Sequence, residues 1–351
     1  MGKLAVYRYA LLMFLIAQIV VSIFTFVGLF GGDTNPVGHT ASAMMVFALP
    51  FFIICNFILL IYWLCRRKWL FGAIPFITLI ACIPYIGTIF QPFPKKADTN
   101  ETGGLKIATY NVARFGRAAS GFIAQDILSE MKKENVDVLC IQEYSDESGD
   151  NKNTETYKEF FPYMVKGNSD MAIFSRYPIT GAKNLPFEYT NNSAMWANID
   201  VNGKLIKVFN IHLETTGFNG VLHQVAKNEM KGMETKNNAI IEAIYGTYTL
   251  GMIVRAGQAE RVTYERRQSR IPTIVCGDFN DVPYSYVYNT LLDDMKDGFK
   301  ECGSGWMYTF RGAKSVRIDY IFHDKRFEGI NYYTTPLTYS DHLPVFMKIK
   351  L

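Results

Sequence analysis

The sequence predicts three membrane-spanning helices followed by an α/β domain whose sheets are covered by helices. Two observations carry this prediction. Residues 9–30, 40–64 and 69–90 form long stretches without a charged side chain. Beyond residue 104, apolar runs rich in β-branched residues alternate with helical patterns, and this alternation is typical of α/β domains.

The three apolar stretches are long enough to cross a bilayer. Each has about twenty residues or more, and at roughly 1.5 Å per residue such a helix covers a hydrocarbon core of ~30 Å. A cleaved signal peptide is an alternative for the first stretch, but its apolar run exceeds the usual ~7–15 residues and two more stretches follow. Residues 92–104 are rich in Pro, Lys, Thr and Gly, which indicates a linker. We therefore expect a membrane anchor over residues 1–94, a linker over residues 95–104 and one domain over residues 105–351.

Charge is concentrated in the predicted anchor. The chain has 36 basic and 32 acidic side chains, and residues 1–94 hold five and one of them, so residues 95–351 hold 31 of each. A neutral domain does not indicate a non-specific nucleic-acid binder, because such proteins gain affinity by neutralising phosphates. A local basic patch remains compatible with this sum.

The basic residues of the anchor predict its orientation. Lys3 and Arg8 precede the first stretch and residues 66–68 lie between the second and third, whereas residues 31–39 contain no Lys or Arg. Cytoplasmic loops carry the excess of such residues. Three spans then place the domain on the extracytoplasmic side. The six cysteines show neither a disulfide framework nor a zinc-binding spacing, and we expect buried free thiols.

Seven β-type runs and two helical patterns make up the predicted domain. We expect helices over residues 121–134 and 248–270. The strands are expected within residues 105–111, 136–143, 171–178, 205–214, 273–280, 316–322 and 344–351.

Several of these strands end in side chains able to bind a metal or a phosphate. They are Asn111, Glu143, His212, Asp278 and Asn280; Asp319 lies inside the sixth run, and Asp341 with His342 precedes the last. Ligands bind at strand ends in open α/β sheets. The segment IVCGDFNDVP, residues 274–283, alone would be an ordinary acidic turn. The repeated ending favours a site.

The ordered set of motifs resembles the endonuclease/exonuclease/phosphatase superfamily, which includes DNase I-like nucleases, abasic-site endonucleases, neutral sphingomyelinases and inositol-phosphate phosphatases. The matching pieces are TYNVARF, CIQE, IFSRYPI, FNIHL, GDFND, RIDYI and SDH, in the family's order and over nearly all of residues 105–351. The resemblance implies a four-layer DNase I-like sandwich, two β-sheets flanked by helices. It also implies a metal-dependent hydrolase of phosphoesters.

The resemblance assigns a role to each candidate residue. Glu143 is the main metal ligand, Asn111 assists, and Asp341 reaches the metal or its water. Oxygen ligands suit Mg²⁺, with Mn²⁺ as the alternative. Asp278 orients and deprotonates the nucleophilic water, and Asn280 holds a phosphate oxygen.

Two histidines complete the set that the resemblance implies. His342 bonds the phosphate with its tautomer and charge fixed by Asp319, and His212 is a second imidazole on the phosphate.

Structural alternatives exist for several of these residues. His212 alone is compatible with a satisfied core or surface histidine, and Asn111 with a turn-capping amide. Asp319 is compatible with a buried acid paired to Arg317 or Tyr320. Arg176 could face phosphate or be a solvated cation at a strand end.

Residues 214–247 form an insertion relative to the family pattern. Apolar residues mixed with lysines fit a lid or a membrane-facing segment, and a variable surface loop is the alternative. We expect a membrane-anchored, Mg²⁺-dependent phosphoesterase, most simply a phosphodiesterase, acting on a lipid head group, a nucleic acid or a small phosphoester. The alternatives are a membrane-tethered endo- or exonuclease and a non-catalytic module that binds phosphorylated ligands. No obligate protein partner is indicated.

Overall fold

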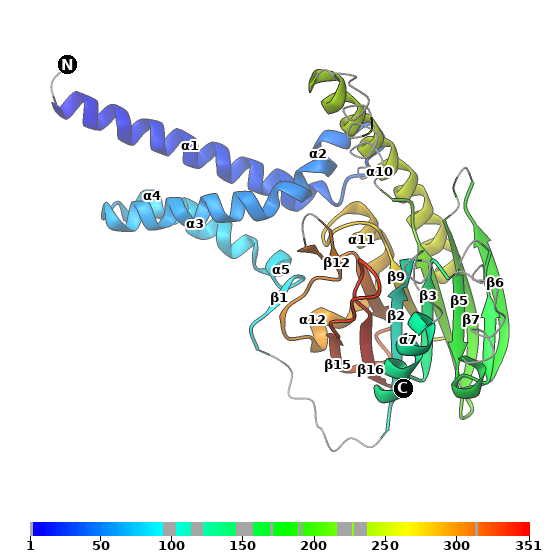
Figure 1. The fold of residues 1–351 in the computed structure, drawn as a ribbon. Coiled ribbons are helices and arrows are strands. Elements are labelled where there is room, and N and C mark those ends of the chain that lie inside the picture. The colour runs from blue at the N-terminus through cyan, green and yellow to red at the C-terminus, as the bar shows by residue number, and fades with distance from the viewer. Residues whose placement is uncertain are drawn as a thin grey trace. The chain divides into compact units, whose positions relative to one another are not determined.

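A computed structural model gives the fold in two compact units (Figure 1). It describes residues 3–93, 103–113, 122–144, 157–168, 171–188, 190, 192–215, 227, 237–312 and 315–351. One unit comprises residues 1–87 with residues 282–289, and the other comprises residues 88–281 with residues 290–351. The predicted linker, apart from its last two residues, and most of the predicted insertion lie outside the described residues.

The first unit is built from apolar helices. They are α1 (Lys3–Gly31), α2 (Thr40–Met44), the 3-10 helix η1 (Met45–Ala48), α3 (Leu49–Cys65), α4 (Trp69–Ala81) and α5 (Ile83–Ile86). Two segments are long and apolar enough to cross a membrane, Leu4–Gly31 with 28 residues and Thr40–Cys65 with 26.

The prediction of a third membrane span over residues 69–90 is wrong. Only 13 residues, Trp69–Ala81, form α4, and a separate short helix follows it. Pro84 explains the interruption, because it has no N–H to donate and its ring clashes with the carbonyl four residues earlier. The described residues therefore contain two helices of spanning length rather than three.

A buried polar network joins the helices of the first unit. Asn56 of α3 donates to Thr25 Oγ1 at 2.8 Å and accepts from Gln18 Nε2 and Ser22 Oγ, both at 3.1 Å. Thr78 of α4 donates to Ser22 Oγ at 3.2 Å. All five side chains are buried. Neutral hydrogen-bonded side chains of this kind hold apolar helices together in a fixed register.

The second unit contains two six-stranded mixed sheets. The first has the strand order β10-β14-β9-β8-β7-β6, and the second β15-β16-β2-β3-β5-β4. The first sheet consists of β10 (Lys296–Asp297), β14 (Asp319–His323), β9 (Thr273–Asp278), β8 (Lys204–His212), β7 (Ser193–Val201) and β6 (Ile179–Pro186). The second consists of β15 (Glu328–Thr334), β16 (Val345–Lys350), β2 (Leu105–Asn111), β3 (Val138–Gln142), β5 (Met171–Ser175) and β4 (Tyr163–Lys166).

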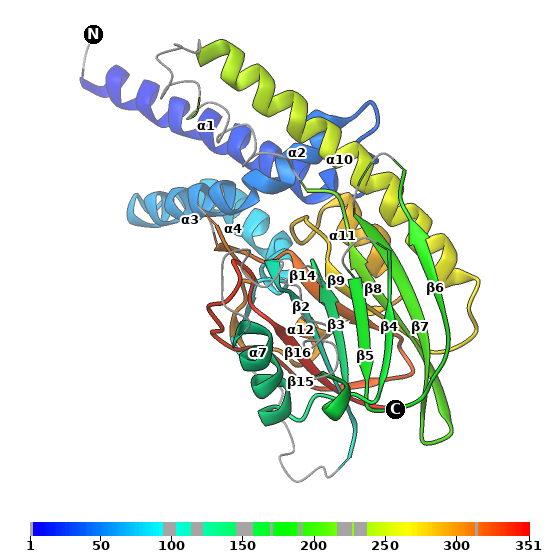
Figure 2. The same ribbon diagram turned by 45° about the vertical axis from the view of Figure 1, so that its right-hand side comes forward.

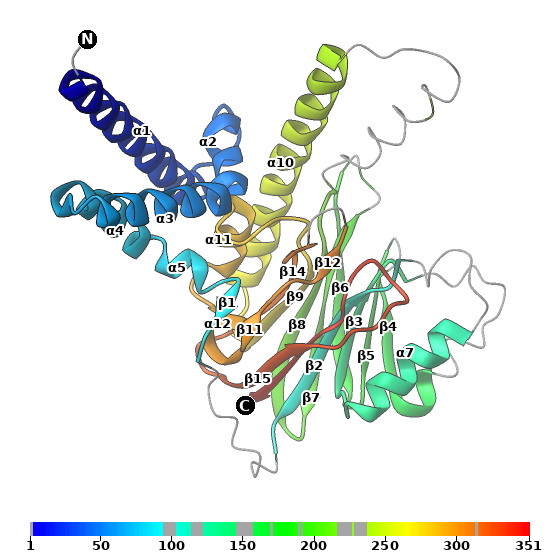
Figure 3. The same ribbon diagram turned by 60° about the vertical axis from the view of Figure 1, so that its left-hand side comes forward.

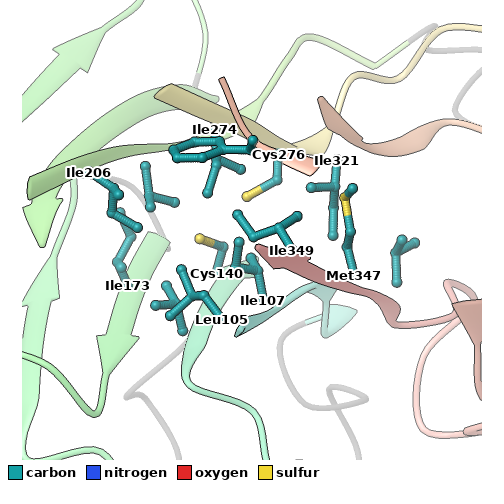
Figure 4. Close-up of a cluster of buried hydrophobic side chains, with 14 of the residues drawn as sticks. Leu105, Ile107, Cys140, Ile173, Ile206, Ile274, Cys276, Ile321, Met347 and Ile349 are labelled. Atoms are coloured by element: carbon teal, nitrogen blue, oxygen red, sulfur yellow. The ribbon is translucent and has the colours of Figure 1, made fainter. Parts of the chain in front are cut away.

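The two sheets face each other across the main core (Figure 4). Ile206, Ile274 and Ile321 of the first sheet meet Ile107 and Ile349 of the second, and all five are buried. β-branched residues pack well on the pleated face of a sheet. Removing their apolar side chains from water is the main contribution to the stability of the fold. The core therefore fixes the two sheets against each other.

Helices cover the outer faces of the sheets (Figures 1, 2 and 3). Helix α7 (Phe122–Lys133) packs Ile127 and Met131 into a second buried cluster with the outer side chains of β2 and β3. Helix α10 (Asn237–Arg267) is tied to the first sheet through Glu265, which accepts from Trp196 Nε1 of β7. This arrangement confirms the predicted four-layer sandwich. The remaining elements are α11 (Tyr286–Leu292), α12 (Gly298–Cys302), β1 (Phe90–Gln91), β11 (Gly305–Trp306), β12 (Phe310–Arg311) and β13 (Ser315–Val316).

All seven predicted runs contain strands, but the expected set was incomplete. Strands β4, β6, β7 and β15 were not predicted. β6 contains Gly, Lys, Asn and Pro, which have low strand propensity, and its exposed face lacks a clean alternation. The second predicted helix begins at Asn237 rather than residue 248, so the end of the predicted insertion is helical.

Candidate active site

Six strand ends meet at one edge of the sandwich. β2 pairs with β3 in parallel and β8 pairs with β9 in parallel, so Asn111, Glu143, His212 and Asp278 follow the same direction to the same edge. β14 and β16 run antiparallel to β9 and β2, and their N-terminal ends lie there too. Sheet topology alone thus gathers side chains from residues 111 to 342.

Asp278 lies opposite two other candidates in the first sheet. Asp278 is in β9. Its backbone is in register with His212 of β8 on one side and with Asp319 of β14 on the other. Asp319 is the first residue of β14 and lies within the sixth predicted run. Gly277 permits the close pairing, because a Cβ at this position, where φ is +136°, would lie 2.0 Å from the Ile211 carbonyl oxygen.

The Asp278 carboxylate is the centre of the cluster. Its Oδ2 lies 3.1 Å from Asn111 Nδ2, 3.7 Å from His342 Nε2 and 3.8 Å from His212 Nε2. Only 1% of the residue is exposed. Burial raises the pKa of Asp278 to about 6, the nearby Asp319 adds to the rise, and the two imidazoles oppose it. A carboxylate with this pKa is a stronger base than an exposed aspartate.

His342 and Asp319 form a buried hydrogen-bonded pair. His342 Nδ1 lies 2.9 Å from Asp319 Oδ2, so Asp319 fixes the orientation of the ring. Burial by itself lowers the pKa of His342, but the charges of Asp319 and Asp278 outweigh it and raise the pKa to about 10. The imidazole is therefore positively charged at neutral pH, and its Nε2 presents an N–H toward the Asp278 side of the site.

His212 differs from His342 in its electrostatics. Burial lowers the pKa of His212, and the charges of Asp278 and Glu143 only partly offset this. The site therefore pairs a charged imidazole with a neutral one. Their ring nitrogens lie at similar distances from the same carboxylate oxygen of Asp278.

Asn111 joins the second sheet to this cluster. Its side-chain amide donates to Glu143 Oε1 at 3.3 Å and to Asp278 Oδ2 at 3.1 Å, and its Oδ1 accepts from the backbone N–H of Ala113. Asn111 therefore caps a turn, as the structural alternative supposed, and also contacts two site carboxylates. Glu143 follows β3 with a φ of +53°. This left-handed conformation is costly for glutamate and typical of functional positions.

Asn280 and Asp341 lie at the border of the cluster. The backbone N–H of Asn280 donates to Asp278 Oδ1 at 2.8 Å, and its side-chain amide donates to the Leu213 carbonyl. Asp341 is exposed, and its Oδ1 accepts from Ser340 Oγ at 3.4 Å. The structure thus brings Asn111, Asp278, Asn280, Asp319, His212 and His342 together with Glu143, while Asp341 lies beside His342 at the surface.

The donors present fit a hard divalent cation. Among the described residues, Asp278, Asp319 and His342 form the one compact group of acidic and imidazole side chains with metal-ligand spacing. His342 Nδ1 bonds Asp319, so this ring nitrogen is engaged in the structure. Glu143 and Asn111, which contact each other beside Asp278, offer further oxygen atoms, and oxygen donors are what Mg²⁺ and Mn²⁺ prefer.

Several supporting residues were not predicted. Ser340 Oγ donates to the Asn111 carbonyl at 2.7 Å and accepts from the His342 backbone N–H at 3.1 Å. Thr309 Oγ1 accepts from the backbone N–H groups of Ile318 and Asp319. Ser340 belongs to the SDH motif, so the sequence contained a signal for it. Thr309 precedes β14 by ten residues and gave no such signal.

A buried pair of amide side chains, Gln142 and Asn210, links the two sheets next to the site. Gln142 of the second sheet donates to Asn210 Oδ1 of the first at 2.6 Å. Asn210 in turn donates to the Ile141 and Ala172 carbonyls. These bonds cross the core close behind Glu143 and help hold the two sheets in one alignment.

Two of the structural alternatives are wrong or incomplete. Asp319 bonds His342, whereas Arg317 makes its ion pair with Asp297 at 2.6 Å. Arg176 is half-exposed and pairs with Asp137 at 3.2 Å, so it is engaged away from the cluster.

Comparison with known protein families gives one match over most of the chain. The profile of the endonuclease/exonuclease/phosphatase family matches residues 108–342. A profile described only as a domain of unknown function matches residues 11–89. No curated protein sequence matches the chain.

Solved structures with the same fold are distant in sequence. Truncated TDP2 from Caenorhabditis elegans is 13% identical, with a TM-score of 0.52 over 70% of this chain and 97% of that one. The protein SmcL is 16% identical, with a TM-score of 0.51 over 71% of this chain and 99% of that one. An endonuclease/exonuclease/phosphatase from Beutenbergia cavernae is 18% identical, with a TM-score of 0.51 over 71% and 72% of the two chains. These similarities establish the fold.

Proposed function

The chain belongs to the endonuclease/exonuclease/phosphatase family and is a metal-dependent hydrolase acting on phosphoester bonds, and we propose that it is a Mg²⁺-dependent phosphodiesterase with Asp278 as its base. One observation carries the assignment of the base. Asp278 is buried between two imidazoles and an amide, and its pKa is raised to about 6. A general base is most effective when its pKa is close to the working pH.

The other residues of the cluster neutralise and orient the phosphate. His342 is cationic and held by Asp319, so its Nε2–H donates a charge-assisted hydrogen bond to a phosphoryl oxygen. His212 and Asn280 supply neutral donors beside it. Because Asn280 is tied through its backbone N–H to Asp278, the donor and the base are fixed relative to each other.

Glu143, Asn111 and Asp341 are the residues that would hold the cation. A bound Mg²⁺ supplies positive charge that stabilises the developing charge on the phosphoryl and leaving oxygens. Asn111 in addition spaces two acids, because its amide donates to both Glu143 and Asp278. That bridge keeps a ligand carboxylate and the base apart without a charge of its own.

The proposal is tested with the full chain in detergent. Bis(p-nitrophenyl) phosphate, p-nitrophenyl phosphate and supercoiled plasmid DNA are each incubated with Mg²⁺ or with chelator, and Asp278→Asn is the control. Mg²⁺-dependent release from the diester, lost in Asp278→Asn, is the expected result. Faster release from the monoester makes the enzyme a phosphatase, DNA nicking makes it a nuclease, and silence on all three overturns the catalytic assignment.

The metal assignment has its own test. Glu143→Gln keeps the size and removes the charge of the predicted main ligand, so we expect the Mg²⁺ concentration for half-maximal turnover to rise at least tenfold. Glu188→Gln, a change of the same type at a residue outside the cluster, is the matched control. An unchanged metal requirement in Glu143→Gln would remove Glu143 from the ligand set.

We also propose an integral membrane protein with its catalytic domain on the extracytoplasmic side. Lys3 and Arg8 at the N-terminal end of α1, and residues 66–68 after α3, favour a cytoplasmic location for the start of the first long apolar segment and the end of the second. The extracytoplasmic location requires residues 69–86 to cross as well. A reporter enzyme active only outside the cytoplasm, fused after Leu351, is expected to be active. A silent fusion together with an active cytoplasmic reporter would place the domain inside.

A further inference from the structure

The N-terminal half of α10 is apolar and exposed, unlike its C-terminal half. Between Asn237 and Val254 the only charged residue is Glu242, whereas charges are frequent from Arg255 to the end of the helix. Among the described side chains from Ala239 to Leu250, none is buried. Figure 3 shows this half of α10 extending beyond the sheets of the second unit.

The C-terminal half of α10 packs against the domain. Met252, Ala256, Ala259 and Val262 recur at intervals of three or four residues and are buried. This spacing is the apolar stripe of a helix lying on a globular surface. The helix therefore has one anchored half, which needs no further partner, and one half in which Tyr245 and Leu250 are exposed.

The exposed residues lie mainly on one side of the helix, and Ile240, Ile244 and Tyr248 on the other side are only partly exposed. Tyr245 is 49% exposed and Leu250 is 62% exposed. Five residues at ~100° each place these two side chains about 140° apart around the axis. A helix lying in a membrane interface places one face in the lipid, and a single broad exposed face fits that arrangement.

The rest of the chain supplies the lipid surface. Two segments of the first unit are long and apolar enough to cross a membrane. The apolar half of α10 is shorter than a span, since its fourteen residues from Asn237 to Leu250 cover about 21 Å against a core of ~30 Å. An exposed tyrosine such as Tyr245 is typical of the membrane–water interface. We propose that Asn237 to Leu250 of α10 lies in the interface of a phospholipid bilayer.

The position of this segment gives it a direct connection to the active site. Arg255 donates through Nε to Asp281 Oδ2 at 3.2 Å and through Nη1 to the Glu214 carbonyl at 3.1 Å. Gln258 Oε1 accepts from the Glu214 backbone N–H. Glu214 lies two residues after His212, and Asp281 lies next to Asn280. A lipid-bound α10 therefore holds these loops at the bilayer surface, where a lipid phosphoester would be the substrate that they meet.

The experiment measures the surroundings of α10 with spin labels and needs no turnover. Cys55 and Cys65, the two native thiols that are not buried, are changed to Ser. A nitroxide is attached to Leu250→Cys or to Tyr264→Cys in the full chain, which is reconstituted in nanodiscs of palmitoyl-oleoyl phosphatidylcholine and phosphatidylglycerol. Tyr264 is 67% exposed on the anchored half. It lies fourteen residues further on and about 40° away around the axis, so it is the matched control.

Lipid contact predicts opposite accessibilities at the two positions. The label at residue 250 should be several-fold more accessible to oxygen than to a water-soluble nickel complex, and the label at residue 264 should show the reverse. Tyr245→Cys repeats the measurement at a second position of the exposed face. Equal access of the nickel complex at residues 250 and 264 would overturn the proposal. Low access of both reagents at residue 250, or dipolar broadening between labels on two chains, would assign the segment to a protein contact instead.

This outcome is separable from the proposed reaction. Each labelled variant is first assayed on the soluble diester, so loss of phosphodiesterase activity and loss of lipid contact are read independently. Retained turnover with an aqueous α10 would leave the active-site assignment intact and refute only the interface.

Discussion

The two units of this protein bury polar side chains in opposite ways. In the first unit, the buried polar residues are neutral and largely satisfy one another: Asn56 alone bonds Gln18, Ser22 and Thr25. At the edge of the sheets, the buried groups are ionisable and incompletely paired, and Asp319 Oδ1 has no hydrogen-bond partner although it is fully buried. Satisfied neutral networks hold structure, whereas a partly satisfied charged cluster costs stability and is retained where it serves chemistry.

The largest effect is expected from a substitution at the centre of the charged cluster. Asp278→Asn keeps the shape and removes the base, so kcat/KM for the diester should fall by about 10³-fold or more. The surface variant Asp294→Asn should leave kcat/KM unchanged, because exposed ion pairs contribute little. The thermal midpoint of Asp278→Asn should not fall, since the substitution relieves a buried charge. Near-normal turnover would remove Asp278 from the role of base.

The next effect concerns the charge of His342. Asp319→Asn removes the carboxylate that raises the pKa of this imidazole to about 10. The wild-type rate should be lost above about pH 10 as His342 loses its proton. In Asp319→Asn the alkaline fall should move toward neutral pH, and kcat should drop by roughly 10²-fold. An alkaline limb that stays in place would show that His342 does not act as a cation.

The acid side of the same profile reports the base. Asp278 must be ionised to accept a proton, so turnover falls as the pH drops through its pKa. With the cation bound, that fall should occur at or below about pH 6, because added positive charge favours the carboxylate. Asp319→Asn should also shift the acid limb downward, since Asp319 raises the pKa of Asp278.

A smaller effect is expected from Ser340, which supports Asn111 and His342. Ser340→Ala removes the bond to the Asn111 carbonyl and the acceptor for the His342 N–H. We expect about a tenfold loss in kcat with little change in KM, since the variant displaces His342 without removing it. Ser340→Thr, which keeps the hydroxyl, should restore most of the rate. Failure of threonine to do so would mean that packing rather than the hydroxyl is responsible.

The smallest effect on turnover is expected in the neutral network. Asn56→Leu leaves the partners of Asn56 in α1 without their bonds, so the first unit should lose about 1–2 kcal/mol of unfolding free energy. Phe57→Leu, at the neighbouring 55% exposed residue, is the control. Detergent unfolding measures the stability, and turnover of the soluble diester should stay unchanged. A catalytic defect in Asn56→Leu would contradict the division of roles between the two units.

Sequence reasoning found the residues of the cluster but not their supports. Asp278 and His342 stand in short motifs at the ends of strongly apolar strands, where composition and position agree. Thr309 acts through a hairpin that brings it beside Asp319 only in the folded chain, so no local pattern marks it. Strand β6 was missed because its residues have low strand propensity and only one of its side chains is buried. The prediction of a third span was wrong because Pro84 interrupts the helix.

Glu143 and Asn280 show where local rules were expected to fail. Both adopt a positive φ, of +53° and +52°, which is acceptable for asparagine and costly for glutamate. A propensity argument gives no reason to place glutamate there. The function proposed for it does, because the left-handed residue turns the chain at the end of β3 and directs the carboxylate toward Asn111.

The register of β8, β9 and β14 has a consequence for folding. His212, Asp278 and Asp319 share one row across three strands, and the pairings on the two sides of β9 are parallel and antiparallel. A slip of one residue in either pairing would turn a site residue into the core. The row also joins segments far apart in the chain, which makes its closure slow. During refolding, enzymatic activity should therefore return last, after the helices and the core have already formed.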